Sequence, residues 1–458
     1  MLDRAARIVD GFDTDLDVGF LNTPPASAEE VGDGVSLVQA FSNVVSFSTD
    51  DGLVLFDVSH QMSAPAVLSA IRSWSNDEIH TAVYTHGHID HVTGARTFVD
   101  DAAERGHRPI TFVGHEAIPA RFDRYDLTNG YNGHINKRQF RLPEPFFPSD
   151  FIHPHQTYDD HTTLSVGGTT FELHHAKGET DDHTWAWVPE HRAVCVGDLF
   201  IWQFPNAGNP QKVQRFAWEW AVALRDMAAL RPELLLPAHG MAIGGADRVV
   251  SVLNNTAEAL ESLHEQTLSL MNAGARLDEV IHTVRLPQHL ADLPYLKPTY
   301  DEPEFVVRNI WRLYGGWYDG NPAHLKPAPD AELAREMAAL AGGASVLAAR
   351  AESLAADGDL RLACHLVEMA HLADPDDLSI HGVRAAVYDA RRRAETSFMA
   401  TGIYRAAALD SRDRLTSCLS DQDFLEISPK SGFPYCYSRQ IRSYLSGFMG
   451  TAPELETP

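Results

Sequence analysis

The chain has 458 residues, 44% of them hydrophobic and 22% charged, so it is long enough for two or three globular domains with buried cores. Its 63 Asp and Glu residues outnumber its 37 Lys and Arg residues, giving a formal net charge of −26 at pH 7. That charge repels nucleic acids and anionic membranes, so we expect neither as a partner. No apolar run approaches the length of a membrane span, the first residues lack the apolar centre of a secretory signal, and the four cysteines are scattered. We therefore expect a cytoplasmic protein with a small-molecule substrate.

The first half of the chain alternates between β-rich runs and helical stretches. Residues 35–59 contain two β-rich runs on either side of the hairpin-type turn Asp50–Gly52. A helical stretch at 64–74 follows, and further strands are predicted at 80–85, 107–114, 162–176, 183–190 and 193–198. The helix FAWEWAVALRDMAAL then precedes the run PELLLPAHG. This mixture predicts a layered α/β domain over about residues 1–250.

The second half of the chain is predicted to be helical. Residues 251–412 show helical apolar spacing, interrupted by glycines and by the turns ADGD and DPDD. The two helices around ADGD resemble one tetratricopeptide-type pair. We expect this all-α part to serve packing or association. Residues 413–458 mix Pro, Gly and Ser with aromatic residues and receive no assignment.

One short segment gathers candidate metal ligands. The sequence YTHGHIDHVTGA follows an apolar strand and places four candidates within six positions, namely His86, His88, Asp90 and His91. Alternate side chains of a loop converge, so His86 and His88 point the same way while Asp90 and His91 address a neighbouring position. Satisfying all four ligands requires a second cation. The alternative interpretation is a coincidental cluster of surface histidines.

The segment THGHIDH resembles the signature of the metallo-β-lactamase-fold hydrolases, and later landmarks arrive in that superfamily's order. KGETDDHT carries Glu179 where a histidine normally stands, CVGDLF supplies Asp198, and LLLPAHG supplies His239. Asp57 in VLFDVS matches the aspartate that usually orients a ligand from behind. The resemblance covers about residues 35–245 and implies an αββα sandwich.

The glutamate at this position narrows the resemblance to the alkylsulfatase branch, which uses Glu as that ligand. That branch also carries a helical dimerisation domain with a GWFDGNPA-type motif, and this chain reads YGGWYDGNPAHLKPAP. The resemblance then runs to about residue 412 and implies a homodimer. Two features depart from the branch: the shared carboxylate is Asp198 where Glu is common, and we expect no sterol-carrier-like C-terminal domain in the 45 or so residues after 412.

The resemblance implies a complete set of ligands for two cations. One metal would take His86, His88 and Glu179, and the other would take Asp90, His91 and His239, with Asp198 bridging. Asp90 and Asp198 are also expected to be catalytic. His183 is either a rival ligand or a partner behind the ligands. Such mixed nitrogen and oxygen ligands suit two zinc ions, with manganese or iron as alternatives.

Two neighbouring cations can share one water and turn it into hydroxide near neutral pH, which predicts a hydrolase that needs no serine or cysteine nucleophile. The charges of two divalent cations, three carboxylates and a hydroxide cancel, so an anionic substrate needs additional cationic side chains. We expect these to come from NGYNGHINKRQF and NPQKVQR, and an aromatic wall from Trp202; the cationic candidates are His134, Lys137, Arg138, Lys212 and Arg215. The alternative for each of these charges is a solvated loop position.

These expectations combine into a dinuclear zinc hydrolase that cleaves sulfate esters of alkyl or other organic alcohols through a metal-bridging hydroxide. One alternative is hydrolysis of a neutral ester, lactone or amide on the same site. A second alternative is a non-catalytic, metal-bound dimer that binds a ligand.

Overall fold

The structure is a computed structural model that describes residues 1–13 and 27–417. The chain divides into two compact units, Met1–Gly133 with Phe146–Gly320, and His134–Pro145 with the chain from Asn321 onward. The domain boundary predicted at residue 250 lies inside the long helix α8 (Ala246–Asn272), because that helix packs on the first unit. The first unit therefore continues to Gly320. Most of the predicted extension 413–458 lies outside the described residues.

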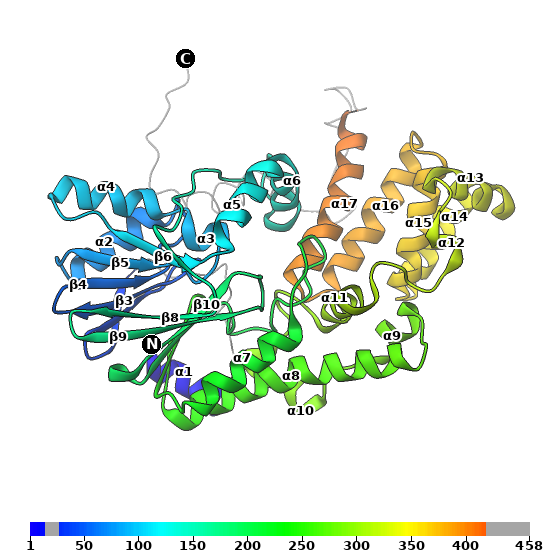
Figure 1. Ribbon diagram of the computed structural model, residues 1–458. Coiled ribbons are helices and arrows are strands. Elements are labelled where there is room, and N and C mark those ends of the chain that lie inside the picture. The colour runs from blue at the N-terminus through cyan, green and yellow to red at the C-terminus, as the bar shows by residue number, and fades with distance from the viewer. Residues whose placement is uncertain (14–26, 418–458) are drawn as a thin grey trace, which may run out of the picture. The chain divides into compact units, whose positions relative to one another are not determined.

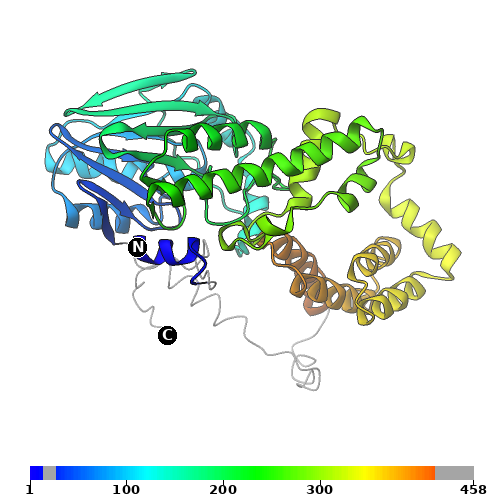
Figure 2. The ribbon, with the colours of Figure 1, turned by 90° about the horizontal axis from the view of Figure 1, so that it is seen from below.

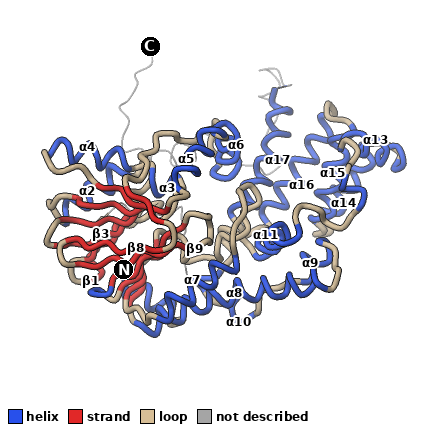
Figure 3. The backbone as a smooth tube through the Cα atoms, in the orientation of Figure 1, coloured by secondary structure: helices blue, strands red, loops and turns tan. Residues whose placement is uncertain are grey.

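Two β-sheets form the centre of the first unit (Figures 1 and 3). In the first sheet the strands follow chain order, antiparallel up to β4 and parallel from β4 onward. Its strands are β1 (Ala28–Gly32), β2 (Val35–Val38), β3 (Val44–Thr49), β4 (Gly52–Phe56), β5 (Ile79–Val83), β6 (Thr111–His115) and β7 (Gln156–Tyr158). In the second sheet only the neighbours β11 and β12 are parallel. Its strands are, in spatial order, β13 (Ile243–Gly244), β12 (Leu234–Pro237), β11 (Ala193–Gly197), β10 (His183–Val188), β9 (Thr169–Ala176) and β8 (His161–Val166).

Alternating side chains give each sheet two buried faces. On β4, Leu53 and Leu55 join a core cluster with α2 (Ala64–Trp74) and α4 (Ala95–Arg105). Val54 and Phe56 join a second cluster, which also contains Phe171 of β9 and therefore fills the space between the sheets. The same alternation on β11 sends Cys195 into that inner cluster, as expected of a packing cysteine. The layers are thus helix, sheet, sheet and helix, which confirms the predicted αββα sandwich.

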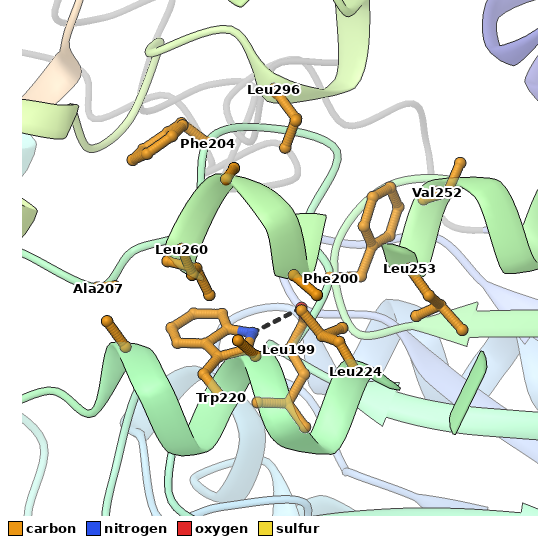
Figure 4. Packing of buried hydrophobic residues seen from close by; sticks show 14 of the residues in the cluster. Leu199, Phe200, Phe204, Ala207, Trp220, Leu224, Val252, Leu253, Leu260 and Leu296 are labelled. Atoms are coloured by element: carbon orange, nitrogen blue, oxygen red, sulfur yellow. Dashed lines mark hydrogen bonds between the residues drawn. The ribbon is translucent and has the colours of Figure 1, made fainter. Parts of the chain in front are cut away.

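The second helical layer of the sandwich packs against the loop that follows β11 and fixes its backbone. Helices α7 (Ala217–Ala229) and α8 lie side by side (Figure 2) and cover the outer face of the second sheet. Trp220 of α7 is fully buried, and its indole N–H donates to the Leu199 carbonyl at 2.9 Å, with Leu253 and Leu260 of α8 nearby in the cluster (Figure 4). Leu199 directly follows Asp198, so core packing fixes the backbone beside a predicted ligand.

The second unit is helical, as predicted. Helices α14 (Ala344–Ala356) and α15 (Leu360–Ala373) form a pair around the ADGD turn, where the Asp359 side chain accepts the Leu362 N–H and begins α15. The other helices assigned entirely to this unit are α12 (Pro322–Leu325), α13 (Asp330–Ala341), α16 (Leu378–Arg393) and α17 (Phe398–Ser417). No helix in the described parts of the chain is both long enough and apolar enough to cross a membrane.

Candidate metal centre

The predicted ligands lie where strands of both sheets end. His86 follows β5 by a short loop, Asp198 follows β11 directly, and His239 follows β12. Glu179 lies in the turn between β9 and β10. The strands deliver their ligands to one edge of the sandwich because β11 and β12 run parallel, while β10 begins where they end. Residues that are about 150 positions apart in the sequence therefore meet.

The first group of candidate ligands consists of His86, His88 and Asp198, whose ligand atoms all lie within 4.8 Å of one another. His86 Nε2 is 2.8 Å from His88 Nδ1 and 3.9 Å from Asp198 Oδ2. His88 immediately precedes the short helix α3 (Ile89–Val92), whose start turns the chain so that the next ligands face another point.

The second group consists of Asp90, His91 and His239, again with ligand atoms within 4.8 Å of one another. Asp90 Oδ2 lies 3.4 Å from His91 Nε2 and 3.5 Å from His239 Nε2. Asp198 Oδ1 approaches the same two nitrogens, at 3.5 and 3.2 Å respectively. Asp198 therefore has one oxygen near each group, the placement predicted for a shared carboxylate.

Glu179 lies beside the first group and forms a buried ion pair with Arg215. Its Oε1 is 3.5 Å from His88 Nδ1 but only 2.7 Å from Arg215 Nη1, and the Asn206 amide also donates to it. Glu179 and Arg215 are 3% and 2% exposed. The first group contains Asp198 as its third member, where Glu179 was predicted, so direct ligation by Glu179 stays a prediction.

The side chains present fit divalent cations. Among the described residues, three polar atoms of the cluster are buried without a hydrogen bond: His91 Nε2, Asp198 Oδ1 and Glu179 Oε2. Burial raises the pKa of Glu179 well above its ordinary value, and repulsion by Asp198 adds to this despite Arg215. Buried carboxylates of this kind need positive charge nearby, and cations would supply it.

The histidines of the first group also have the protonation that metal binding requires. Burial lowers the pKa of His86 well below its ordinary value, and the neighbouring His91 and His88 lower it further. Burial lowers the pKa of His88 in the same way, helped by the charge of Arg215. Both imidazoles are therefore neutral near pH 7 and offer a lone pair.

Asp57 supports His91 from behind. It follows β4 in a left-handed backbone conformation, with φ at 63°, and its Oδ2 lies 2.8 Å from His91 Nδ1. The Thr85 N–H donates to Oδ1 at 2.7 Å and the Thr85 hydroxyl donates to Oδ2 at 2.8 Å, which holds the carboxylate in place. His91 Nδ1 thus donates to Asp57 and leaves Nε2 facing the ligand group, the arrangement typical of metal-binding histidines.

His183 lies behind the ligands rather than among them. Its Nε2 accepts the Asp198 backbone N–H at 3.1 Å, and its ring stacks on His86 with centroids 4.9 Å apart. Burial lowers the pKa of His183 to about 4, so the ring is a neutral acceptor. Gly197, at φ 51°, leaves room for it, because a Cβ there would lie 2.7 Å from the ring. Of its two predicted roles, the geometry matches the partner behind the ligands.

Sequence reasoning missed a buried ion pair that fixes the loop between His86 and His88. Arg121 of α5 (Ile118–Leu127) donates through Nε to Asp182 Oδ2 at 2.5 Å, and the Gly87 N–H donates to the same oxygen at 3.3 Å. A Cβ on Gly87 would lie 2.7 Å from the Arg121 side chain. Asp182 belongs to the KGETDDHT block, but nothing in that block identifies its distant partner.

The charged groups of the cluster affect the pKa values of Lys212 and Tyr300. Burial and the charge of Arg215 lower the pKa of Lys212 to about 8, while Asp90 and Glu179 act in the opposite direction. Lys212 was predicted as a substrate residue, whereas Tyr300 was not predicted. Burial raises the pKa of the Tyr300 hydroxyl well above its ordinary value, and the charges of Glu179 and Asp90 raise it further. The tyrosine lies about 60 residues after the last predicted ligand, outside the motif blocks.

The other predicted substrate residues have different surroundings. Trp202 is buried, with its indole N–H donated to the Met241 carbonyl at 2.7 Å, so it packs behind the His239 loop instead of forming an open wall. His134, Lys137 and Arg138 lie on α6 (Asn129–Phe140), within the part of that helix assigned to the second unit. His134 and Lys137 are exposed. Their participation in the site stays a prediction.

Comparison with known proteins agrees with this geometry. Residues 37–239 match the metallo-beta-lactamase superfamily, and residues 276–414 match the alkyl sulfatase dimerisation family. A linear primary-alkylsulfatase from a Pseudomonas strain is 28% identical over 73% of this chain and 67% of its own length. An (R)-specific secondary-alkylsulfatase from Pseudomonas is 25% identical over 81% of this chain and 60% of its own length. An alkyl/aryl-sulfatase of Saccharomyces cerevisiae is 23% identical over 76% of this chain and 57% of its own length.

The fold is similar to that of a solved protein. The stereoselective inverting sec-alkylsulfatase Pisa1 from Pseudomonas superposes with a TM-score of 0.77 at 22% identity, covering 84% of this chain and 66% of that one. This chain thus spans about two thirds or less of the relatives it matches. The chain thus carries a metallo-beta-lactamase domain over residues 37–239 and an alkyl sulfatase dimerisation domain over residues 276–414.

Proposed function

We propose that the chain is a metal-dependent hydrolase that cleaves sulfate esters of organic alcohols, with two zinc ions as its metals and a homodimer as its assembly. The observation that carries the proposal is the pair of ligand groups that meet at Asp198 on one edge of the sandwich. The relatives named as alkylsulfatases support the substrate class, and the match to the dimerisation family supports the homodimer.

The chain's own residues would bind and orient the reactants. His86, His88 and Asp198 would hold one cation, Asp90, His91 and His239 the other, and Glu179 would complete the set. Bound cations would supply Lewis acidity and lower the pKa of a water molecule towards neutrality. Burial of these side chains strengthens every electrostatic interaction at the site.

Two of the predicted cationic side chains, Arg215 and Lys212, differ in whether their charge can attract an anionic sulfate group. Arg215 forms an ion pair with Glu179 at 2.7 Å, so its positive charge neutralises this proposed ligand instead of attracting a substrate. Lys212 is half-buried, and Asp90 and Glu179 act on its charge. Lys212 is therefore the side chain that we assign to the sulfate group.

Lys212 is expected to make sulfate ester hydrolysis depend on pH. Its ammonium is present below its pKa of about 8 and is lost as pH rises through that value, so KM for a sulfate ester should rise across this range. Lys212→Met should lower kcat/KM below pH 8 by about 10- to 100-fold, the worth of a hydrogen bond between charged groups, and should flatten this pH dependence. Lys212→Arg should keep the charge above pH 8 and shift the loss to higher pH.

The measurement is kcat/KM from pH 6 to 10 for a sulfate ester and for a neutral carboxylic ester of the same alcohol. Hydrolysis of the neutral ester should change little between the variants. Unchanged sulfate kinetics in Lys212→Met would remove Lys212 from the proposed site.

The same site has a second candidate function, hydrolysis of a neutral ester, lactone or amide. The observation that favours it is the use of Arg215 by Glu179, which leaves the cluster with little excess positive charge. A neutral substrate would need no such charge.

Metal analysis beside a hydrolysis panel tests the proposal and separates the two candidates. We expect purified protein to hold two transition-metal ions per chain, to release sulfate from alkyl sulfates, and to lose both properties in His86→Ala. Turnover of neutral esters without sulfate release would favour the second candidate. Protein without transition metal and without hydrolytic activity would contradict both candidates.

A further inference from the structure

The loop between β2 and β3 lies against both ends of the His239 segment. In this loop, residues 39–43, the Phe41 carbonyl accepts a hydrogen bond from His239 Nδ1 at 2.5 Å, and the Phe41 ring packs edge-on against the imidazole at a centroid distance of 5.8 Å. A carbonyl can only accept, so Nδ1 carries the proton and Nε2 keeps a lone pair that faces Asp90 and Asp198. The loop thus decides which nitrogen of His239 is offered as a ligand.

Asn43 connects this loop to the backbone on both sides of His239. One side-chain nitrogen donates to the carbonyl of Pro237 at 3.0 Å and to that of Gly240 at 2.8 Å. The Asn43 backbone N–H donates to the carbonyl of Ala238 at 2.6 Å. Asn43 is 1% exposed, so these bonds form away from water. A single residue therefore satisfies the carbonyls of three residues that surround His239.

The other end of the carboxamide closes the loop on itself. Asn43 Oδ1 accepts the Ala40 N–H at 3.3 Å, so the side chain uses donor and acceptor together. Gly240 has φ at 86°, which allows the turn that brings its carbonyl to Asn43. The Ser59 hydroxyl donates to the Ser42 carbonyl at 2.8 Å and supports the loop from the side of β4. This pattern requires a carboxamide, because an aspartate of the same shape has no N–H to donate.

We propose that Asn43 is the positioning residue for His239, and that it sets the affinity of the Asp90–His91–His239 group for a divalent cation. The inference rests on the proposed function, because it assumes that this group binds metal. Asn43 makes no contact with substrate in this assignment and acts only through His239. Partners behind a metal ligand typically change metal affinity by about 10- to 100-fold when they are removed.

The test uses the full-length protein, stripped of metal with a chelator and titrated with Zn²⁺ and with Co²⁺. In Asn43→Asp, a carboxylate oxygen replaces the donor and faces two carbonyls at unchanged volume. We expect one ion to bind as in the wild type and the other to bind about 10- to 100-fold more weakly. The visible absorption of bound Co²⁺ should change for the weakened ion alone.

Two control variants separate positioning from general loss of stability. Asn255→Asp makes the same chemical exchange on α8, where the asparagine donates to the Tyr295 hydroxyl at 2.7 Å. Leu263→Ala removes a fully buried side chain from the same helix. Both should keep wild-type affinity for both ions and the wild-type Co²⁺ spectrum, even if their unfolding midpoints fall.

The outcomes separate this inference from the proposed function. If the wild type binds two ions and folded Asn43→Asp binds both with unchanged affinity and spectrum, Asn43 is not a positioning residue. If the wild type binds no transition metal, the proposed function fails and this inference fails with it. Should Asn43→Asp not fold, Asn43→Ala can replace it, because alanine removes the same side-chain donors without adding charge. If Asn43→Ala binds both ions with wild-type affinity, the inference is overturned.

Discussion

Asp198→Ala is expected to abolish sulfate ester hydrolysis and to release both metal ions. Asp198 places Oδ1 3.2 Å from His239 Nε2 and Oδ2 3.9 Å from His86 Nε2, so its removal affects both ligand groups at once. The loss of activity should be about 1,000-fold or more, well beyond the roughly 10- to 100-fold expected for residues behind the ligands. Metal content after dialysis and kcat/KM for an alkyl sulfate measure the two effects.

Comparison with Asp198→Asn and with a control outside the ligand groups sharpens this test. Asp198→Asn keeps the volume of the side chain but removes the negative charge shared by the two groups, so it should also lose metal. Asp101→Asn removes a carboxylate that pairs with Arg72 and Arg105, on helices α2 and α4, and should keep metal content and activity. Full activity with two bound ions in Asp198→Ala would show that the two groups do not share this residue.

Arg215→Met is expected to lower the free energy of unfolding more than any other substitution proposed here. The loss should be larger in metal-free protein than in metal-loaded protein. The substitution leaves Glu179, which is 3% exposed, as an uncompensated buried carboxylate. Breaking one side of a buried pair costs about 3–5 kcal/mol of unfolding free energy. Bound cations would replace part of the missing positive charge, so the loss should be smaller in the metal-loaded protein. Denaturant unfolding with and without chelator measures the difference.

A more exposed pair of the same residue types provides the control. Arg225 lies 2.6 Å from Glu261, but their side chains are 39% and 25% exposed. Arg225→Met should therefore cost no more than about 1 kcal/mol, with or without metal. The double variant Arg215→Met with Glu179→Gln should recover part of the lost stability, because no buried charge then remains unpaired. Equal losses for Arg215→Met and Arg225→Met would show that burial of the Glu179 pair carries no additional cost.

Much of the fold follows from local sequence patterns. The predicted helix at 64–74 coincides with α2, and the Asp50–Gly52 turn connects β3 to β4 with Thr49 opposite Gly52. Leu53 and Leu55 alternate with Val54 and Phe56 within the β-rich run predicted after that turn, and the structure places the two pairs in separate core clusters. The boundaries of the compact units were harder to predict from the sequence. Helix α8 packs on the first unit through tertiary contacts, so this unit continues to Gly320.

The sequence by itself determined the class of the site, since closely spaced His and Asp residues after a strand are a local signal and strand ends fix where ligands appear. Only the tertiary structure decided that Arg215 neutralises Glu179, that Lys212 and Tyr300 are electrostatically close to the cluster, and that Asn43 holds the backbone around His239. Asn43 and Gly240 are 197 positions apart. A bond between a side-chain amide and a distant carbonyl leaves no periodic trace in the sequence, because its partner is chosen by the path of the folded loops and not by neighbouring residues.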